Sequence, residues 1–357
     1  MLARTLFRVL LTVVVLGALP ASANAAAGWN GFGAGSWPPG SWRPYAVNSP
    51  FNRLTARVMV HPNSARIVAK VLSLGSIGNL TAGPGIADTP SDYGHPTFWA
   101  QPTDPLVTLD WTGGGPGSAI DGLRIRVPTA ARAAGGDDGH MTVVQPDGWE
   151  YDFWRAKRPS STVLSFSGGG RTRIDGSGLN SGATAANFGN LAGMIRGQEL
   201  AAGRIDHALF AVVRCLARNT SFGWGTRSSP NSAYVYPASH WGNACSTDST
   251  DLPPMGARLK LEMTDLQISA LLLPAWKKTI LRALAKYGAY IGDTGGPGLG
   301  FMFESGTTYT PFGRADPVAT YARSNGITYW DDYYVFKVAG GLDWTRYLRV
   351  LVPPVVL

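Results

Sequence analysis

The chain has 357 residues, of which 45% are hydrophobic and 15% are charged, and its formal net charge is +8. A chain of this length can bury a sizeable core, as one large domain or two modest ones. The positive charge favours acidic glycans, anionic cell walls or phospholipid surfaces as partners. Because Lys and Arg are scattered and form no basic run, the sequence argues against a nucleic-acid partner.

The first 25 residues have the pattern of a secretory signal peptide. Arg4 and Arg8 form a positive n-region, residues 9–19 are apolar, and residues 23–25 are a small-residue cleavage site. The apolar stretch is too short to span a bilayer, and no later segment reaches about 18 apolar residues. We therefore expect a secreted protein, extracellular or associated with the cell wall, with no stable membrane insertion.

The two cysteines, Cys215 and Cys245, are expected to form one disulfide in an oxidising compartment. Metal binding by this pair is disfavoured, because neither residue has a CxxC or Cys-x-His neighbour. We expect no cofactor. A structural calcium ion in the glycine loops stays open, although the chain lacks an EF-hand pattern.

After the signal, we expect a lead-in over residues 26–50 and a single domain over residues 51–357. The lead-in is rich in Gly, Trp, Pro and Ser, and its tryptophans are expected to clamp it onto the domain. Apolar spacing predicts a helix at residues 61–75 and, most clearly, an amphipathic helix at residues 274–287. The second helix is expected to turn its basic side chains to solvent, namely Lys277, Lys278, Arg282 and Lys286.

Most of the remaining segments are strand-sized and separated by Gly and Pro, which is typical of a sandwich or barrel. Strands are predicted at residues 97–101, 106–111, 123–127, 141–145, 149–156, 163–167, 205–213, 233–237, 255–263, 289–292 and 301–304. Short helices are predicted at residues 198–202 and after a capping box formed by Thr264 and Gln267. The fold class is thus all-β, as an antiparallel β-sandwich or jelly-roll-like single domain with two or three peripheral helices.

Between these elements, residues 168–193 form a glycine-rich loop of low hydrophobicity. Long loops without secondary structure are uncommon in compact domains and often line a functional site. We therefore expect this loop beside the site.

Three of the five histidines stand at comparable places in the predicted strands. His140 and His207 each begin a strand beside an aspartate, and His240 follows a strand. If these strands are neighbours, the histidines converge at one rim, where imidazole can move protons near neutral pH. Structural histidines, or a metal site formed by His140, His207 and Asp293, are the alternatives. The candidate catalytic residues are His207, His140, Asp206, Asp138, Tyr236 and His240.

Glycan cleavage fits the available side chains better than acyl transfer, because no GxSxG motif is present and the cysteines are paired. Glycoside hydrolysis needs two facing carboxylates, and a lyase needs an acid, a base and a cation for the sugar carboxylate. The candidate carboxylates are Asp138, Asp152, Asp206, Asp293 and Glu304. The candidate substrate-binding residues are Arg196, Arg258, Asp293 and Glu304.

Several motifs resemble a group of uncharacterised secreted bacterial proteins, mainly from actinomycetes. These are Asp-Gly-His-Met at residues 138–141, Ile-Asp-His-Ala-Leu at 205–209, Tyr-Pro-Ala-Ser-His at 236–240 and Pro-Pro-Met-Gly-Ala-Arg at 253–258. The resemblance covers most of the mature chain and implies secretion and a single domain, but no activity. The segment at His207 is also loosely similar to the Gln-Ile-His strand of jelly-roll alginate lyases, from which Asp206 departs.

From these features the sequence predicts a secreted polysaccharide-cleaving enzyme, either a lyase or a glycoside hydrolase, with a polysaccharide or cell-wall glycan as its partner. We expect it to act as a monomer, on a glycan that could be acidic. The alternative is a non-catalytic glycan- or cell-wall-binding protein in which the histidines are structural. A wall-modifying peptidase or transpeptidase is disfavoured, because no nucleophile motif is visible.

Overall fold

The computed structural model describes residues 35, 37–38, 42–75, 80–82, 92–218, 227–228, 232–247, 251–296, 298–330 and 333–354. The predicted signal peptide and most of the first half of the lead-in lie outside these residues. Within the described ranges, no helix is both long enough and apolar enough to cross a membrane.

A mixed five-stranded sheet forms the centre of the molecule. Its strand order is β15 (Gly300–Phe301), β10 (Leu209–Val213), β14 (Ala289–Thr294), β13 (Arg258–Leu261) and β18 (Leu348–Val350). β10 and β14 run parallel, with a register shift between Ala211 and Val212, and the other pairs are antiparallel. The parallel pair is possible because α3 and α4 lie in the chain between β10 and β14 and allow a crossover.

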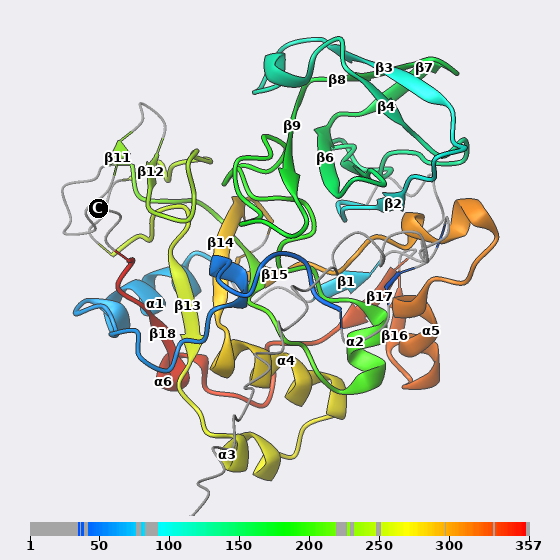
Figure 1. Ribbon diagram of the computed structural model, residues 1–357. Coiled ribbons are helices and arrows are strands. Elements are labelled where there is room, and N and C mark those ends of the chain that lie inside the picture. Colours follow the sequence, from blue (N-terminus) through cyan, green and yellow to red (C-terminus); the bar gives the residue numbers. More distant parts are fainter. Residues whose placement is uncertain are drawn as a thin grey trace, which may run out of the picture.

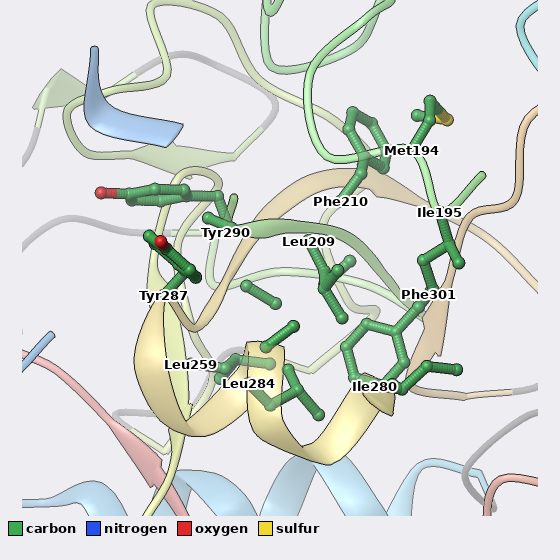
Figure 2. Close-up of a cluster of buried hydrophobic side chains, with 14 of the residues drawn as sticks. Met194, Ile195, Leu209, Phe210, Leu259, Ile280, Leu284, Tyr287, Tyr290 and Phe301 are labelled. Carbon is green, nitrogen blue, oxygen red and sulfur yellow. The ribbon is translucent and has the colours of Figure 1, made fainter. Parts of the chain in front are cut away.

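The longest helix, α4 (Ala275–Lys286), packs on this sheet and closes the larger hydrophobic core. Ile280 and Leu284 of the helix face Leu209 of β10 and Leu259 of β13, as Figure 2 shows. The sequence prediction of this helix is confirmed. One side chain differs from the prediction, because Lys277 is buried and its ammonium donates to the carbonyls of Lys337 and Gly340.

Two four-stranded sheets lie together in the upper part of Figure 1 and enclose a second hydrophobic core. One sheet has the order β2 (Thr97–Trp99), β5 (Met141–Val144), β6 (Trp149–Trp154) and β9 (Gly168–Arg173). The other has the order β4 (Arg124–Arg126), β3 (Leu106–Trp111), β8 (Val163–Phe166) and β7 (Lys157–Ser160). Large apolar side chains such as Phe98, Leu109, Phe153 and Phe166 fill the space enclosed by these sheets.

The remaining elements surround these sheets. The smaller sheets are β1 (Leu80–Ala82), β17 (Tyr333–Phe336) and β16 (Thr328–Trp330), and the pair β11 (Arg227–Ser228) and β12 (Ala233–Tyr234). The other helices are α1 (Ser64–Ser73), α2 (Gly197–Ala202), α3 (Asp265–Ala270), α5 (Pro317–Ser324) and α6 (Trp344–Tyr347). Short 3₁₀ turns occur at Pro50–Asn52, Ser118–Ile120, Gly306–Thr308 and Thr310–Phe312.

The protein is therefore β-rich with a minority of helix, as the sequence predicts, but two details differ. The sheets are mixed, since β2–β5, β3–β8 and β10–β14 are parallel pairs. The described residues also hold more α-helices than the two or three expected. Helices such as α6 and α5 span only one or two turns, which is too short for apolar periodicity to reveal them.

A glycine-rich segment expected to be loop is in fact the strand β9. A Cβ atom at Gly169 would lie 2.5 Å from the carbonyl oxygen of Asp152, and one at Gly170 would lie 2.4 Å from that of Ser181. The strand is thus squeezed between β6 and the chain around residues 181–182, and only glycine fits there. Strand propensity could not predict this element, because its cause is a tertiary contact.

Two predicted contacts between distant parts of the chain are confirmed, one a disulfide and one a cluster of tryptophan rings. Cys215 and Cys245 form a disulfide with a Cα–Cα distance of 5.0 Å. In the lead-in, Trp37 and Trp42 pack edge-to-face on each other and on Trp99, with ring centroids 5.5–5.6 Å apart. Trp37 and Trp42 therefore do clamp the lead-in onto the domain, whereas Trp29 lies outside the described residues.

Candidate active site

A cavity of about 730 Å³ lies where the central sheet meets the upper sheets. Four of the candidate residues predicted from the sequence line it. Its walls are formed by the ends of β6, β9 and β14, the turn before β5, the glycine loop and residues 240–244. The nominated residues that line it are Asp138, His140, His240 and Asp293. The predicted glycine loop lines it through Gly182, Ala183, Thr184, Ala185 and Asn187.

Asp293 projects from the end of β14, where the hydrophobic strand leaves the core. Although the residue keeps some exposed surface, burial of its carboxyl group raises the pKa of Asp293 to about 7, and the charge of Asp138 adds to this effect. The backbone N–H of Thr294 donates to Oδ1 at 2.7 Å and opposes the shift. Asp293 therefore keeps its proton to a higher pH than an ordinary aspartate does.

Asp138 faces the same cavity from the turn that precedes β5. Its carbonyl accepts from the backbone N–H of Arg155 at 2.8 Å, which fixes the turn against the end of β6. Its carboxylate Oδ1 accepts from the indole N–H of Trp154 at 2.9 Å. The second carboxylate of the cavity is thus held by both backbone and side-chain contacts.

His140 lies immediately before β5, which starts at Met141, and stands in the cavity wall, only 4% exposed. Burial lowers its pKa to about 4, although the backbone at Phe153 counteracts part of this effect. Its ring lies 4.3 Å from the ring of His95, whose Nδ1 donates to the Asn190 carbonyl at 3.2 Å. The Nδ1 of His140 is buried and forms no hydrogen bond with a described residue. His140 therefore offers the cavity a neutral imidazole.

His240 stacks on Trp241, with ring centroids 3.9 Å apart and an interplanar angle of 18°. Its Nδ1 lies 3.2 Å from the Ala185 carbonyl and 3.1 Å from that of Trp241, so this nitrogen must carry a proton to donate. In the neutral ring the lone pair is then on Nε2, which no described residue hydrogen-bonds. His240 has the tautomer required of a proton acceptor.

Some residues in and around the site could not be predicted from the sequence. His95 lies on an irregular segment with no motif, and Trp154 has the pattern of an ordinary aromatic residue in a strand. Arg218, Asn243 and Thr294 also line the cavity, and Arg218 donates to the Cys245 carbonyl at 3.3 Å. The one available signal was the disulfide, which draws residues 215–218 and 242–245 together.

His207 is not among the cavity residues, and it does not begin a strand, because β10 starts at Leu209. Its Nδ1 donates to the Ala208 carbonyl at 2.9 Å. Its Nε2 lies 2.8 Å from Glu199 Oε1 and 3.2 Å from Arg196 Nη1. Burial alone would raise the pKa of Glu199, but the interactions with His207 and Arg196 outweigh it and lower the pKa. Arg196, Glu199 and His207 form what we term the closed cluster.

The other nominated residues lie elsewhere. Asp206 sits at the surface beside Lys286 and Arg204. Tyr236 and Arg258 line a separate small hollow, where Arg258 donates to the Tyr287 carbonyl at 3.0 Å. Glu304 is buried, accepts from the Gly197 N–H at 3.0 Å and the Tyr309 hydroxyl at 2.9 Å, and has a pKa raised by burial to about 8.

Asp152, also considered as a carboxylate for hydrolysis, is fully buried in β6. Thr142 donates to its Oδ1 at 2.7 Å, and the backbone N–H of Asn190 donates to its Oδ2 at 3.1 Å. It therefore cannot meet a polymer.

In the described part of the chain, no three side chains of His, Cys, Asp or Glu gather in a metal-binding arrangement. Comparisons with protein-family models, with curated proteins and with solved structures find no match. The chemistry of the cavity must therefore be argued from its own geometry.

Proposed function

We propose that the protein is a secreted glycoside hydrolase that cleaves a polysaccharide in the cavity formed by Asp138, His140, His240 and Asp293. One observation carries the proposal: two carboxyl groups share one open cavity, and burial lets Asp293 keep a proton near neutral pH. Two carboxyl groups, one a proton donor and one an ionised base, are what glycosidic hydrolysis requires.

In this mechanism Asp293 donates its proton to the glycosidic oxygen as the bond to the anomeric carbon breaks. Asp138 is the second carboxylate. It accepts a proton from the attacking water, whose oxygen bonds to the anomeric carbon, and the indole N–H of Trp154 keeps Oδ1 in place. Neutral His140 supplies a hydrogen-bonding group without a competing positive charge. The aromatic surfaces of Trp154 and Trp241 suit sugar rings.

A lyase is the second candidate, because His240 keeps a free Nε2 lone pair in the cavity that also contains Arg218. In that reaction His240 would remove the proton beside a uronate carboxylate that Arg218 neutralises. The two reactions differ in products, since a lyase leaves an unsaturated sugar and a hydrolase does not.

The Cys215–Cys245 disulfide supports an extracellular location, since such bonds persist in oxidising compartments. Membership of the secreted actinomycete group, the jelly-roll arrangement of the sheets and the monomeric state stay predictions. None of them is needed for the proposed chemistry.

The test incubates the full chain with neutral and acidic polysaccharides and follows reducing ends together with the ultraviolet absorbance of unsaturated uronates. We expect reducing ends without absorbance, and their loss in Asp138→Asn and Asp293→Asn. Asp110→Asn is the matched control, because Asp110 is an exposed carboxylate on β3. Absorbance rising with reducing ends would favour the lyase. Glycan binding without any cleavage would mean a binding protein and would overturn the proposal.

A further inference from the structure

A second hollow, of about 610 Å³, lies directly behind two walls of the active-site cavity. Consecutive residues alternate between the two spaces. Asp138 lines the cavity while Asp137 lines the hollow, and Trp154 lines the cavity while Arg155 lines the hollow. The two spaces are therefore neighbours that share the chain around these residues as a wall.

Arg155 stands at this wall in a backbone conformation that non-glycine residues rarely adopt, with φ of 53°. Two backbone hydrogen bonds to the turn of Asp138 hold it there: Arg155 N–H to the Asp138 carbonyl at 2.8 Å and Ala156 N–H to the Gly139 carbonyl at 3.0 Å. Its guanidinium carbon lies 4.4 Å from the ring centroid of Trp154. Strain of this kind persists where surrounding contacts over-determine it and is frequent at ligand sites.

The hollow combines cations with hydroxyl groups. Arg155 and Lys157 are both exposed, and neither forms an ion pair with a described acidic residue. Thr112, Ser165 and Ser167 supply hydroxyls, and Thr112 Oγ1 lies 3.3 Å from Ser167 Oγ. Unpaired cations attract an anionic group, whereas hydroxyls and the Asp137 carboxylate match ring hydroxyl groups. A free phosphate ion would be bound by the two cations only, and it has no ring hydroxyl groups for the remaining polar side chains to bind.

We infer that a glycan bound in the cavity passes over this shared wall, and that the hollow is a subsite for an acidic sugar of that chain, in which Arg155 and Lys157 bind a carboxylate or sulfate. The inference rests on the proposed function, since it assumes that the occupant of the cavity is a glycan chain. It narrows the substrate class to anionic polysaccharides.

The test measures binding by calorimetry with three probes: oligogalacturonate, its carboxyl-reduced neutral counterpart, and a chondroitin sulfate oligosaccharide. We expect at least one acidic probe to bind about tenfold more tightly than the neutral one, with a preference that falls as salt rises. The acidic probe that binds tells whether carboxylate or sulfate is recognised. Arg155→Gln with Lys157→Gln should abolish the preference, and Lys157→Gln alone, which leaves the strained position intact, should weaken it.

The charge-matched control is Arg124→Gln with Arg314→Gln, because both residues are exposed and line neither space. An equal loss in the control, or no acidic probe binding better than the neutral one, would overturn the inference. Acidic probes that bind at Arg155 and Lys157 but are never cleaved would overturn the proposed hydrolase and leave the subsite in place. Cleavage of neutral chains with no acidic preference would do the reverse.

Discussion

Two groups of histidine and carboxylate side chains in this molecule use the same residue types in opposite ways. In the closed cluster, Glu199 is satisfied by His207 and Arg196, and these partners lower its pKa. In the cavity, burial raises the pKa of the Asp293 carboxyl, and the nearby carboxylate of Asp138 adds to the rise. Charges that satisfy one another hold a fold together, whereas a carboxyl group left protonated near neutral pH can give its proton to a substrate.

The surroundings explain the difference. Arg196 is 2% exposed and lies 4.1 Å from the ring of Trp37, so the lead-in seals the closed cluster from solvent. The cavity is instead walled by turns and glycines, which leave room for a ligand. We therefore assign stability to the first group and chemistry to the second.

The largest expected effect is on turnover. Asp293→Asn removes the proton donor and should lower turnover about 10²- to 10⁴-fold, with little change in the thermal midpoint. The measurement is the rate of reducing-end formation per folded molecule, beside Asp110→Asn as control. Near-normal turnover in folded Asp293→Asn would remove the contrast between the two groups.

The closed cluster should respond in the opposite way. Glu199→Gln keeps the side-chain shape and the oxygen that accepts from the Arg196 N–H, but leaves the buried Arg196 without its counter-charge. We expect the free energy of unfolding to fall by about 3 kcal/mol, with activity per folded molecule unchanged. Denaturant unfolding measures the loss. Glu262→Gln, at an exposed pair with Arg349, should cost under about 1 kcal/mol.

Glu304 tests how far burial alone governs a carboxyl group near Arg196. Its folded pKa of about 8 lies above its ordinary value, so the folded state keeps a proton that the unfolded state releases. Its stabilising contribution is complete below about pH 4.5 and is lost as the pH rises through about 8. Glu304→Gln should therefore reduce the fall in the free energy of unfolding between pH 5 and 8 by about 3.5 kcal/mol. Denaturant unfolding at several pH values, wild type minus variant, gives this number, and a pH-independent difference would contradict it.

The smallest expected effect concerns coupling inside the cavity. Burial is the main cause of the raised pKa of Asp293, and the charge of Asp138 adds to it. Asp138→Asn should therefore lower the pKa of Asp293 while leaving it above the ordinary aspartate range. Carboxyl carbon NMR titration of the Asp293 signal measures both steps, and an unchanged midpoint would mean that the two carboxyl groups do not interact.

The regular strands and α4 could be predicted because alternating or stripe-like apolar residues between turn residues suffice to define them. β10 begins at Leu209 rather than at residue 205, because the backbone N–H of Ala208 pairs with the Phe51 carbonyl outside the sheet. That contact joins segments far apart in the sequence, so the start of the strand could not be predicted from the local residue pattern.

The same distinction holds for the candidate site. The sequence nominates Asp138, His140, His240 and Asp293, because polar residues at the ends of hydrophobic strands are rare and costly to bury. It also nominates His207, whose partner Glu199 lies only eight residues earlier on a short helix. Whether such a pair is closed to solvent depends on the residues that cover it. Here Trp37 covers the pair by packing on Arg196, and this contact is set by the tertiary fold.

The glycines of the cavity have a consequence for how this protein can change its substrate. A Cβ atom at Gly182 would lie 2.3 Å from the Gly169 carbonyl oxygen, and one at Gly115 would lie 3.4 Å from the Gly168 Cα. Part of the cavity floor is thus main chain against main chain, with no side chain to trim or enlarge. New specificity would have to arise at side chains that line the cavity, such as Trp241 and Arg218, while the depth of the cavity stays fixed by the spacing of the backbone.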